Sequence, residues 1–318
     1  MKSDYYEYLQ RLGKDELIEI LYQPRTHKKA FPGVCMRMIA LKISYDGRRY
    51  SGVARQFGKQ TIDGYLLNAL EITGLGSKLV YAGRTDAGVS AVGMIASVQV
   101  VSRIADPSRS YVLGDEDHKE YRYDLILNSY LPEDIRVIGW APVPDDFSAR
   151  FTCIQRQYRY YFHKDGLDMC KMQDSAHRIK GMTNFYYLCK HSDKNALYER
   201  SIDECRIVDD GDMYYLDIKA RAFLHNMVRK IMWVVLKDGR GEAYDEKRIG
   251  VEEPYPLVFC NAIYPEELQF IVDPRCKVLF DRQAKEIRAR CKIAVLRFEH
   301  SCAGSSMDGE IYIVNKPL

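Results

Sequence analysis

The sequence predicts an α+β fold in which antiparallel sheets are flanked by helices. First, strand-like and helical stretches follow one another without a regular alternation. Second, the strand-like residues 201–208 and 213–220 are joined across Asp-Asp-Gly-Asp, which is typical of a turn between antiparallel strands. Third, no Gly-x-Gly-x-x-Gly fingerprint follows a strand-like stretch, so a doubly wound parallel sheet is not indicated.

The first half of the chain is predicted to begin with a strand and a helix. Residues 36–45 alternate apolar and polar side chains and end in a turn at 46–52. Residues 61–73 have an apolar face at helical spacing, and Thr61 is a suitable N-cap. Further along we expect strands at 79–82 and 94–101, a loop at 103–120, a helix at 121–131 and a strand at 135–143.

The second half is predicted to begin with a strand at 155–163, followed by a helix at 168–180 and the paired strands already described. The clearest helix covers residues 223–239, with Gly239 at its C-terminal end. The tail after Pro274 carries only weak signals of secondary structure.

The order of elements in the two halves is similar, although no repeat is visible in the sequence itself. We therefore expect three parts: a helical N-terminal extension at 1–35, an α+β half at 36–145, and a second α+β half with a C-terminal tail at 146–318.

Composition limits the class of protein. The chain has 318 residues, of which 47% are hydrophobic and 29% charged, enough for a sizeable core. No apolar run approaches the ~18–20 residues needed to cross a bilayer, and the first ten residues do not resemble a secretory signal. We expect an intracellular soluble protein without a membrane partner, in the cytoplasm, the nucleus or both. The nine Cys and seven His are scattered without ligand spacing, so no metal is predicted.

Charge is unevenly distributed although the net charge is only +3. Between Arg25 and Gln60, Asp46 is the only acidic residue among many Lys and Arg, and residues 218–240 are also basic. Residues 106–146 are acidic. Separated zones of this kind are typical of a protein that binds a polyanion such as nucleic acid, but charged runs are also common on solvated faces.

A conspicuous turn follows the predicted strand at 79–82. It reads Gly83-Arg84-Thr85-Asp86-Ala87-Gly88. An Asp on a loop that follows a strand is held rigidly and is well placed for catalysis. Asp-x-Gly is also ordinary turn chemistry, so Asp86 alone does not decide between a structural and a catalytic role.

Residues 147–162 combine arginines with aromatic side chains and contain no acid. Such interleaving is suited to stacking a displaced base and holding its phosphates. On a strand, Tyr158 and Arg159 would lie on opposite faces. A core strand with an arginine-bearing solvent face explains the pattern equally well.

Arg229 lies in a strongly apolar part of the predicted helix 223–239. A buried arginine is costly unless a carboxylate pairs with it, so a partner is expected. The alternative is an arginine whose guanidinium reaches solvent at the helix surface.

Four motifs occur in order along the chain: YDGRRYSGVARQ…TIDGYLLNAL (45–70), GRTDAGVSA (83–91), F-x-A-R-F with R-x-Y-R-Y (147–160) and F-L-H-N-M-V-R (223–229). Together they resemble the TruA-type tRNA pseudouridine synthase family over roughly residues 36–273. LILNSYLPEDIRV (125–137), DDFSARFTCIQRQYRYYF and the N-terminal extension are most similar to the eukaryotic branch that modifies tRNA positions 38 and 39.

This resemblance implies an isomerase that converts uridine to pseudouridine in tRNA without a cofactor or metal. Asp86 matches the required aspartate, which either attacks covalently or removes a ribose proton. Tyr158 matches the tyrosine that stacks on the target base, and Arg229 matches the arginine that pairs with the aspartate. The family fold has two similar halves around a basic active-site cleft.

Further arginines are expected to bind the substrate. Arg84 matches the arginine that fills the space left by the flipped nucleotide or holds phosphate. The remaining candidates, from the basic loop and the arginine-rich strand, are Arg48, Arg49, Arg150 and Arg159.

The sequence departs from the family pattern at Val53-Ala54, at Ala87 and at GMTNFYYLCK (181–190), which bears on the choice of uridine. Alternatives are therefore kept: the same chemistry at tRNA positions 27 and 28, or a tRNA-binding and remodelling protein without catalysis. Whether the protein forms a homodimer is left open.

Overall fold

We describe a computed structural model of the chain, which covers residues 35–104, 120–164, 166–191, 197–211 and 213–302, with side chains described as far as Cys291. By its contacts the chain divides into two units, Met1–Cys35 and Met36–Leu318. The predicted helical extension at 1–35 and most of the predicted loop at 103–120 lie outside the described residues.

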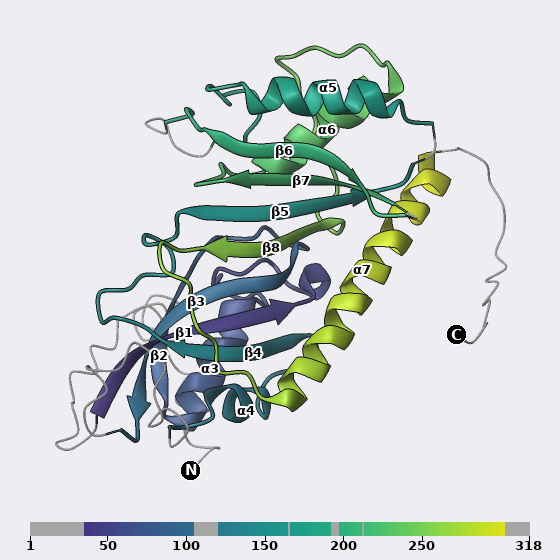
Figure 1. Ribbon diagram of the computed structural model, residues 1–318. Coiled ribbons are helices and arrows are strands. Elements are labelled where there is room, and N and C mark those ends of the chain that lie inside the picture. Colours follow the sequence, from purple (N-terminus) through teal and green to yellow (C-terminus); the bar gives the residue numbers. More distant parts are fainter. Residues whose placement is uncertain (1–34, 105–119, 165, 192–196, 212, 303–318) are drawn as a thin grey trace, which may run out of the picture. The chain divides into compact units, whose positions relative to one another are not determined.

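The larger unit is built on one eight-stranded sheet (Figure 1). Its order is β4-β1-β3-β8-β5-β7-β6, and β2 pairs with β3 outside this path. The strands are β1 (Cys35–Tyr45), β2 (Gly76–Tyr81), β3 (Ser90–Ser102), β4 (Ile135–Pro142), β5 (Gln155–Phe162), β6 (Ile202–Asp209), β7 (Tyr214–Ala220) and β8 (Leu257–Ile263).

The α+β class, with helices flanking the β-structure, is confirmed. The strands of the two predicted halves nevertheless lie in one continuous sheet, and β8 joins them. This strand was missed by the sequence prediction. It pairs in parallel with β3 and antiparallel with β5. The sheet is therefore mixed rather than antiparallel throughout. The division of the chain at residue 145 stays a prediction.

The helices are α3 (Ile62–Thr73), α4 (Tyr123–Asn128), α5 (Met169–Lys180), α6 (Met227–Arg240) and α7 (Pro274–Cys302). The predicted cap of α3 is confirmed, because the Thr61 hydroxyl accepts a hydrogen bond from Gly64 N. α4 is shorter than the predicted 121–131. The 29-residue helix α7 occupies the segment in which the sequence carried weak signals.

The prediction for α6 was wrong at both ends. Asn226 has a left-handed φ of 59°, so residues 223–226 form a loop and the helix begins at Met227. The helix ends at Arg240 and is capped by the left-handed Gly241, rather than by Gly239. Gly239 instead allows α5 to approach, because a Cβ there would lie 2.5 Å from the Met172 Cγ.

Helices cover the two faces of the sheet differently. In Figure 1, α7 crosses in front of the sheet, whereas α3 and α6 lie behind it. The main core contains buried side chains from α3, α5 and α6, together with Tyr158, Tyr160 and Phe162 of β5. A smaller cluster, which includes Tyr161 and Ile287, packs under α7. None of the helices in the described ranges is long and apolar enough to cross a membrane.

Candidate active site

The loop that carries Asp86 connects β2 to β3 and is held by hydrogen bonds at several positions. Ala82 N donates to Ile95 O at 2.8 Å, and the Thr85 hydroxyl is hydrogen-bonded to the buried Tyr45 hydroxyl at 2.8 Å. Gly88 N donates to Tyr50 O at 3.2 Å. The backbone at Asp86 is therefore held by strand β1, strand β3 and the turn after β1.

Gly52 lets that turn approach the Asp86 loop. Its φ is +91°, and a Cβ there would lie 2.6 Å from Thr85 O. A side chain at residue 52 would meet both a strained backbone and a steric clash with a main-chain oxygen. Val53 N in turn donates to Thr85 O at 3.2 Å, so the glycine permits a hydrogen bond that fixes the residue before Asp86.

The Asp86 side chain is 29% exposed and faces His225, whose Nε2 lies 3.6 Å from Asp86 Oδ1. His225 belongs to the loop 223–226, which exists because Asn226 delays the start of α6. His225 O accepts a hydrogen bond from Lys190 N at 2.9 Å, and this bond anchors the loop to the segment after α5. Asp86 is therefore accessible to solvent and lies close to the imidazole of His225.

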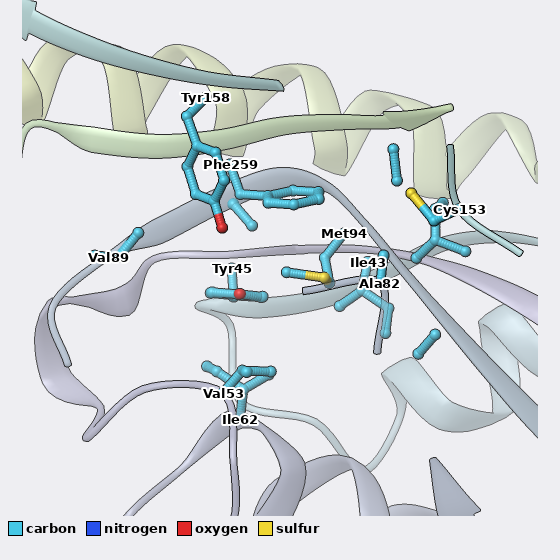
Figure 2. Packing of buried hydrophobic residues seen from close by; sticks show 14 of the residues in the cluster. Ile43, Tyr45, Val53, Ile62, Ala82, Val89, Met94, Cys153, Tyr158 and Phe259 are labelled. Atoms are coloured by element: carbon cyan, nitrogen blue, oxygen red, sulfur yellow. The ribbon is translucent and has the colours of Figure 1, made fainter. Parts of the chain in front are cut away.

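Tyr158 lies within reach of the same loop. Its ring is only 7% exposed and makes edge contacts with Phe223 and Phe259, at centroid distances of 5.2 and 5.1 Å. Its hydroxyl end points toward Tyr45 (Figure 2). A Cβ on Gly83 would lie 3.6 Å from the Tyr158 hydroxyl oxygen. Strand β8 brings these parts together, since Phe259 is paired with Ala91 of β3 on one side and Tyr158 on the other.

Burial raises the pKa of Tyr158 well above its ordinary value, and the neighbouring Tyr45 and Asp86 raise it further. The phenol therefore stays protonated at neutral pH. Its hydroxyl can donate a hydrogen bond at the site but does not act there as a phenolate.

The ion pair expected between Arg229 and Asp86 is not present among the described contacts, and that prediction was wrong. Arg229 Nε donates to Glu252 O at 2.5 Å, and Nη1 donates to Asn226 Oδ1 at 3.4 Å. The guanidinium is half-buried and uses these oxygens in place of a carboxylate. Its role in this structure is to join the start of α6 to the segment before β8.

Four of the candidate substrate arginines are exposed, and two of these, Arg48 and Arg49, also lie against carboxylates. Arg84 is exposed next to Asp86, and Arg150 is exposed with its guanidinium 5.2 Å from the ring centre of Phe151. Arg49 is largely exposed, 3.4 Å from an Asp134 carboxylate oxygen. Arg48 is also exposed, and it donates from Nε and Nη2 to Asp46, at 3.0 and 2.8 Å.

Arg159 lies on the opposite face of β5 from Tyr158, as the strand alternation predicted. Its guanidinium is 4.6 Å from the ring centre of Tyr215 and lines a cavity of about 560 Å³ beneath α7. The sheet separates this cavity from Tyr158. One bound nucleotide cannot contact Tyr158 and Arg159 together.

Comparison with known proteins places this arrangement in a family. The chain is 32% identical over 239 residues to tRNA pseudouridine synthase A of Methanothermobacter thermautotrophicus, covering 73% of this chain and 79% of that protein. It is 31% identical over 261 residues to the protein of the same name from Syntrophomonas wolfei, covering 73% and 99%. The chain belongs to the tRNA pseudouridine synthase family.

Residues 176–251 also match a family model described as tRNA pseudouridine synthase. The mouse tRNA pseudouridine(38/39) synthase is 36% identical over 280 residues, which cover 79% of this chain and 58% of the mouse protein. The chain therefore spans less than two thirds of the length of this mammalian relative. Among solved structures, an archaeal box H/ACA sRNP Nop10–Cbf5 complex aligns with a TM-score of 0.29, too low to support an inference.

In this pseudouridine synthase family member, sequence reasoning missed the roles of two residues near Asp86. Arg156 is 9% exposed, and its guanidinium donates to Ala82 O at 2.8 Å, Arg150 O at 2.6 Å and the Arg221 carbonyl. It thereby holds three loops around the site. His225 lay inside the motif F-L-H-N-M-V-R, but the helix assigned to it concealed its proximity to Asp86.

A cluster of three or more His, Cys, Asp or Glu side chains that could hold a metal ion is absent from the described part of the chain. The groups around Asp86 are an imidazole, a protonated phenol, main-chain amides and exposed guanidinium groups. This set can bind an anionic polymer and support chemistry by a single carboxylate.

Proposed function

We propose that this protein isomerises uridine to pseudouridine in the anticodon stem-loop of tRNA, at positions 38 and 39, with Asp86 as the catalytic group. The observation that carries the proposal is the placement of Asp86. It is partly exposed on a loop fastened to two strands, next to the buried ring of Tyr158. A carboxylate fixed in this way meets the requirement that a catalytic group be held in one geometry.

The reaction rearranges bonds without any net change in atoms. The bond between C1′ of the ribose and N1 of uracil breaks, the base rotates in the site, and C1′ bonds to C5. The proton on C5 leaves, and N1 gains one. Asp86 serves either as a nucleophile that holds the detached fragment covalently or as the base that removes a ribose proton. No oxidant or other reactant is required.

The surrounding residues supply binding and orientation. Tyr158 offers a rigid ring and a hydroxyl whose raised pKa keeps its proton in place. Arg84, two residues before Asp86, and Arg150, whose carbonyl accepts from Arg156, are both exposed, and charge-assisted contacts from them to phosphate would hold the substrate. Similarity to mammalian proteins named for positions 38 and 39 supports that choice of uridine.

The test is to incubate the protein and its Asp86→Asn variant with unmodified tRNA transcripts, without added metal or nucleotide. Pseudouridine is then mapped by carbodiimide treatment and primer extension. We expect stops at positions 38 and 39 with the wild type alone, while the variant still binds tRNA. Stops elsewhere, for example at 27 and 28, would change the proposed site but keep the enzyme. Tight binding without any stop would favour a non-catalytic tRNA-binding protein.

A further inference from the structure

A group of aromatic side chains lies on the segment between α5 and β6, and none of it is used in the proposed chemistry. We call it the aromatic platform. It consists of Tyr186, Tyr187, His191 and Tyr198. The Tyr186 ring centre lies 4.1 Å from that of His191, 5.1 Å from that of Tyr187 and 5.0 Å from that of Tyr198. Tyr186 and Tyr187 are 41% and 44% exposed, so large aromatic surfaces face solvent.

The aromatic platform rests on a well-anchored base. Phe185 is fully buried, and Leu188 and Cys189 are almost so. Phe185 N donates to Tyr198 O at 3.0 Å, which joins the two ends of the segment. Exposed rings held on a fixed backbone lose little conformational entropy when a ligand stacks on them, and clustered exposed aromatic groups mark binding surfaces.

The aromatic platform is connected to the Asp86 site. Lys190 N donates to the carbonyl of His225, and the imidazole of His225 faces Asp86 at 3.6 Å. Lys230 Nζ donates to Tyr187 O at 3.2 Å. The aromatic platform therefore lies on the same side of the sheet as the site, whereas the cavity lined by Arg159 is on the other side.

Charge around the aromatic platform favours a polyanion. Lys190 is exposed, and the ammonium group of Lys230 has further donors beyond its bond to Tyr187 O. In the sequence of residues 181–200, two acidic residues, Asp193 and Glu199, stand against three basic ones, Lys190, Lys194 and Arg200. Rings flanked by lysines match single-stranded RNA, in which unpaired bases stack on aromatic groups and phosphates pair with cations.

We propose that the aromatic platform stacks an unpaired base of the tRNA loop beside the uridine held at Asp86, with Tyr187 as the principal ring and Lys190 and Lys230 at the adjacent phosphates. Tyr187 is the natural choice because, among the residues that the structure describes, its ring contacts one other ring, that of Tyr186, and does so edge to face. This inference rests on the proposed function. It gives the enzyme a requirement for an unpaired neighbour of the target, which a fully paired RNA cannot satisfy.

The experiment measures binding of an unmodified anticodon stem-loop to the full chain carrying Asp86→Asn, so that the RNA is not converted. Tyr187→Ala should weaken binding about tenfold, the scale expected for one stacked base. Tyr187→Phe, which retains the ring, should bind within twofold of the parent. The matched control is Tyr130→Ala, another half-exposed tyrosine, which follows α4 at the β4 end of the sheet.

The stacked base is identified with stem-loops that lack one base at each unpaired position in turn. For one of these RNAs, Tyr187→Ala should cause no further loss, because the base and the ring are two partners of one contact. A second variant, His191→Ala, should also weaken binding and guards against a folding defect in the first. Equal binding of the intact loop by Tyr187→Ala and the parent would overturn the proposal, as would an equal loss with every RNA, including a fully paired hairpin.

The two proposals fail in different ways. If the aromatic platform is not used, Tyr187→Ala in the otherwise native chain converts tRNA as the wild type does, and Asp86→Asn remains inactive. If the proposed function is wrong, the wild type itself forms no pseudouridine in any transcript.

Discussion

His225 Nε2 lies 3.6 Å from Asp86 Oδ1, a separation at which a protonated imidazole would form an ion pair with the carboxylate. The contact depends on the left-handed Asn226, which turns residues 223–226 into a loop instead of the first turn of α6. A histidine at this distance can stabilise or orient the carboxylate without a direct hydrogen bond to it.

Replacing His225 should therefore affect rate more than folding. For His225→Gln we expect kcat/KM to fall about two- to fivefold, the scale of a partly exposed charge contact, with an unchanged melting temperature. His177→Gln, on the exposed side of α5, is the control and should match the wild type. Initial rates on tRNA with a parallel melting curve would check this, and a rate unaffected by the loss of His225 would show that the contact has no functional role.

Arg156 should be important for stability. Its removal leaves the carbonyls of Ala82, Arg150 and Arg221 without their donor in a buried region. We expect Arg156→Met to lower the free energy of unfolding by about 2–4 kcal/mol and to reduce activity by loosening the Asp86 loop. Arg248→Met, at an exposed ion pair with Asp245, should cost less than about 1 kcal/mol. Denaturant unfolding of both variants measures the difference; similar losses would contradict the role assigned to Arg156.

The buried phenol of Tyr158 should make the protein sensitive to alkali. In the unfolded chain tyrosine titrates near pH 10, while burial keeps the pKa of Tyr158 higher in the folded state. Below about pH 10 both states hold the proton, and above it only the folded state does, so the free energy of unfolding falls as pH rises. Above about pH 10, the free energy of unfolding of Tyr158→Phe should therefore fall less steeply than that of the wild type, by about 1.4 kcal/mol per pH unit. Unfolding curves between pH 8 and 11 would test this, and parallel slopes would be the contrary result.

The observed partners of Arg229 can be separated from the expected ion pair by a double-mutant cycle. Because Arg229 binds Glu252 O and Asn226 Oδ1, Arg229→Met and Asp86→Asn should change stability additively, within about 0.5 kcal/mol. Arg229→Met alone should destabilise by about 1–3 kcal/mol. Unfolding free energies of the single and double variants give the coupling, and a value well above 1 kcal/mol would restore the direct pair.

Local sequence signals predicted much of this fold because they report local interactions. Thr61 caps α3 as expected, and the alternation in β5 placed Tyr158 and Arg159 on opposite faces. Strand β8 was missed because LVFCNAI is a short apolar run that acquires its strand character only between β3 and β5. α7 carries Phe280, Ala284, Ile287 and Cys291 at helical spacing, a pattern that the sequence prediction did not use, and Ile287 and Cys291 of this stripe are buried against the sheet.

The sequence predicted which residues form the candidate site better than it predicted the contacts between them. Asp86 and Tyr158 are close together, but no local pattern shows that Arg229 reaches a carbonyl 23 residues away or that Arg156 spans three loops. Those partners are set by tertiary packing. A buried arginine requires acceptor oxygens, and main-chain carbonyls can supply these hydrogen bonds, although they do not supply the negative charge of a carboxylate.

The central claim, that Asp86 drives the isomerisation, is tested most directly by the release of tritium from tRNA labelled at C5 of uridine. The wild type should release the label into water, because the C5 proton leaves when C1′ bonds to C5. Asp86→Asn should lower the rate by more than about a thousandfold, the scale of losing a catalytic nucleophile or base. Asp203→Asn, at an exposed carboxylate that accepts from Gln155, should release label at the wild-type rate. Release by Asp86→Asn at that same rate would contradict the account.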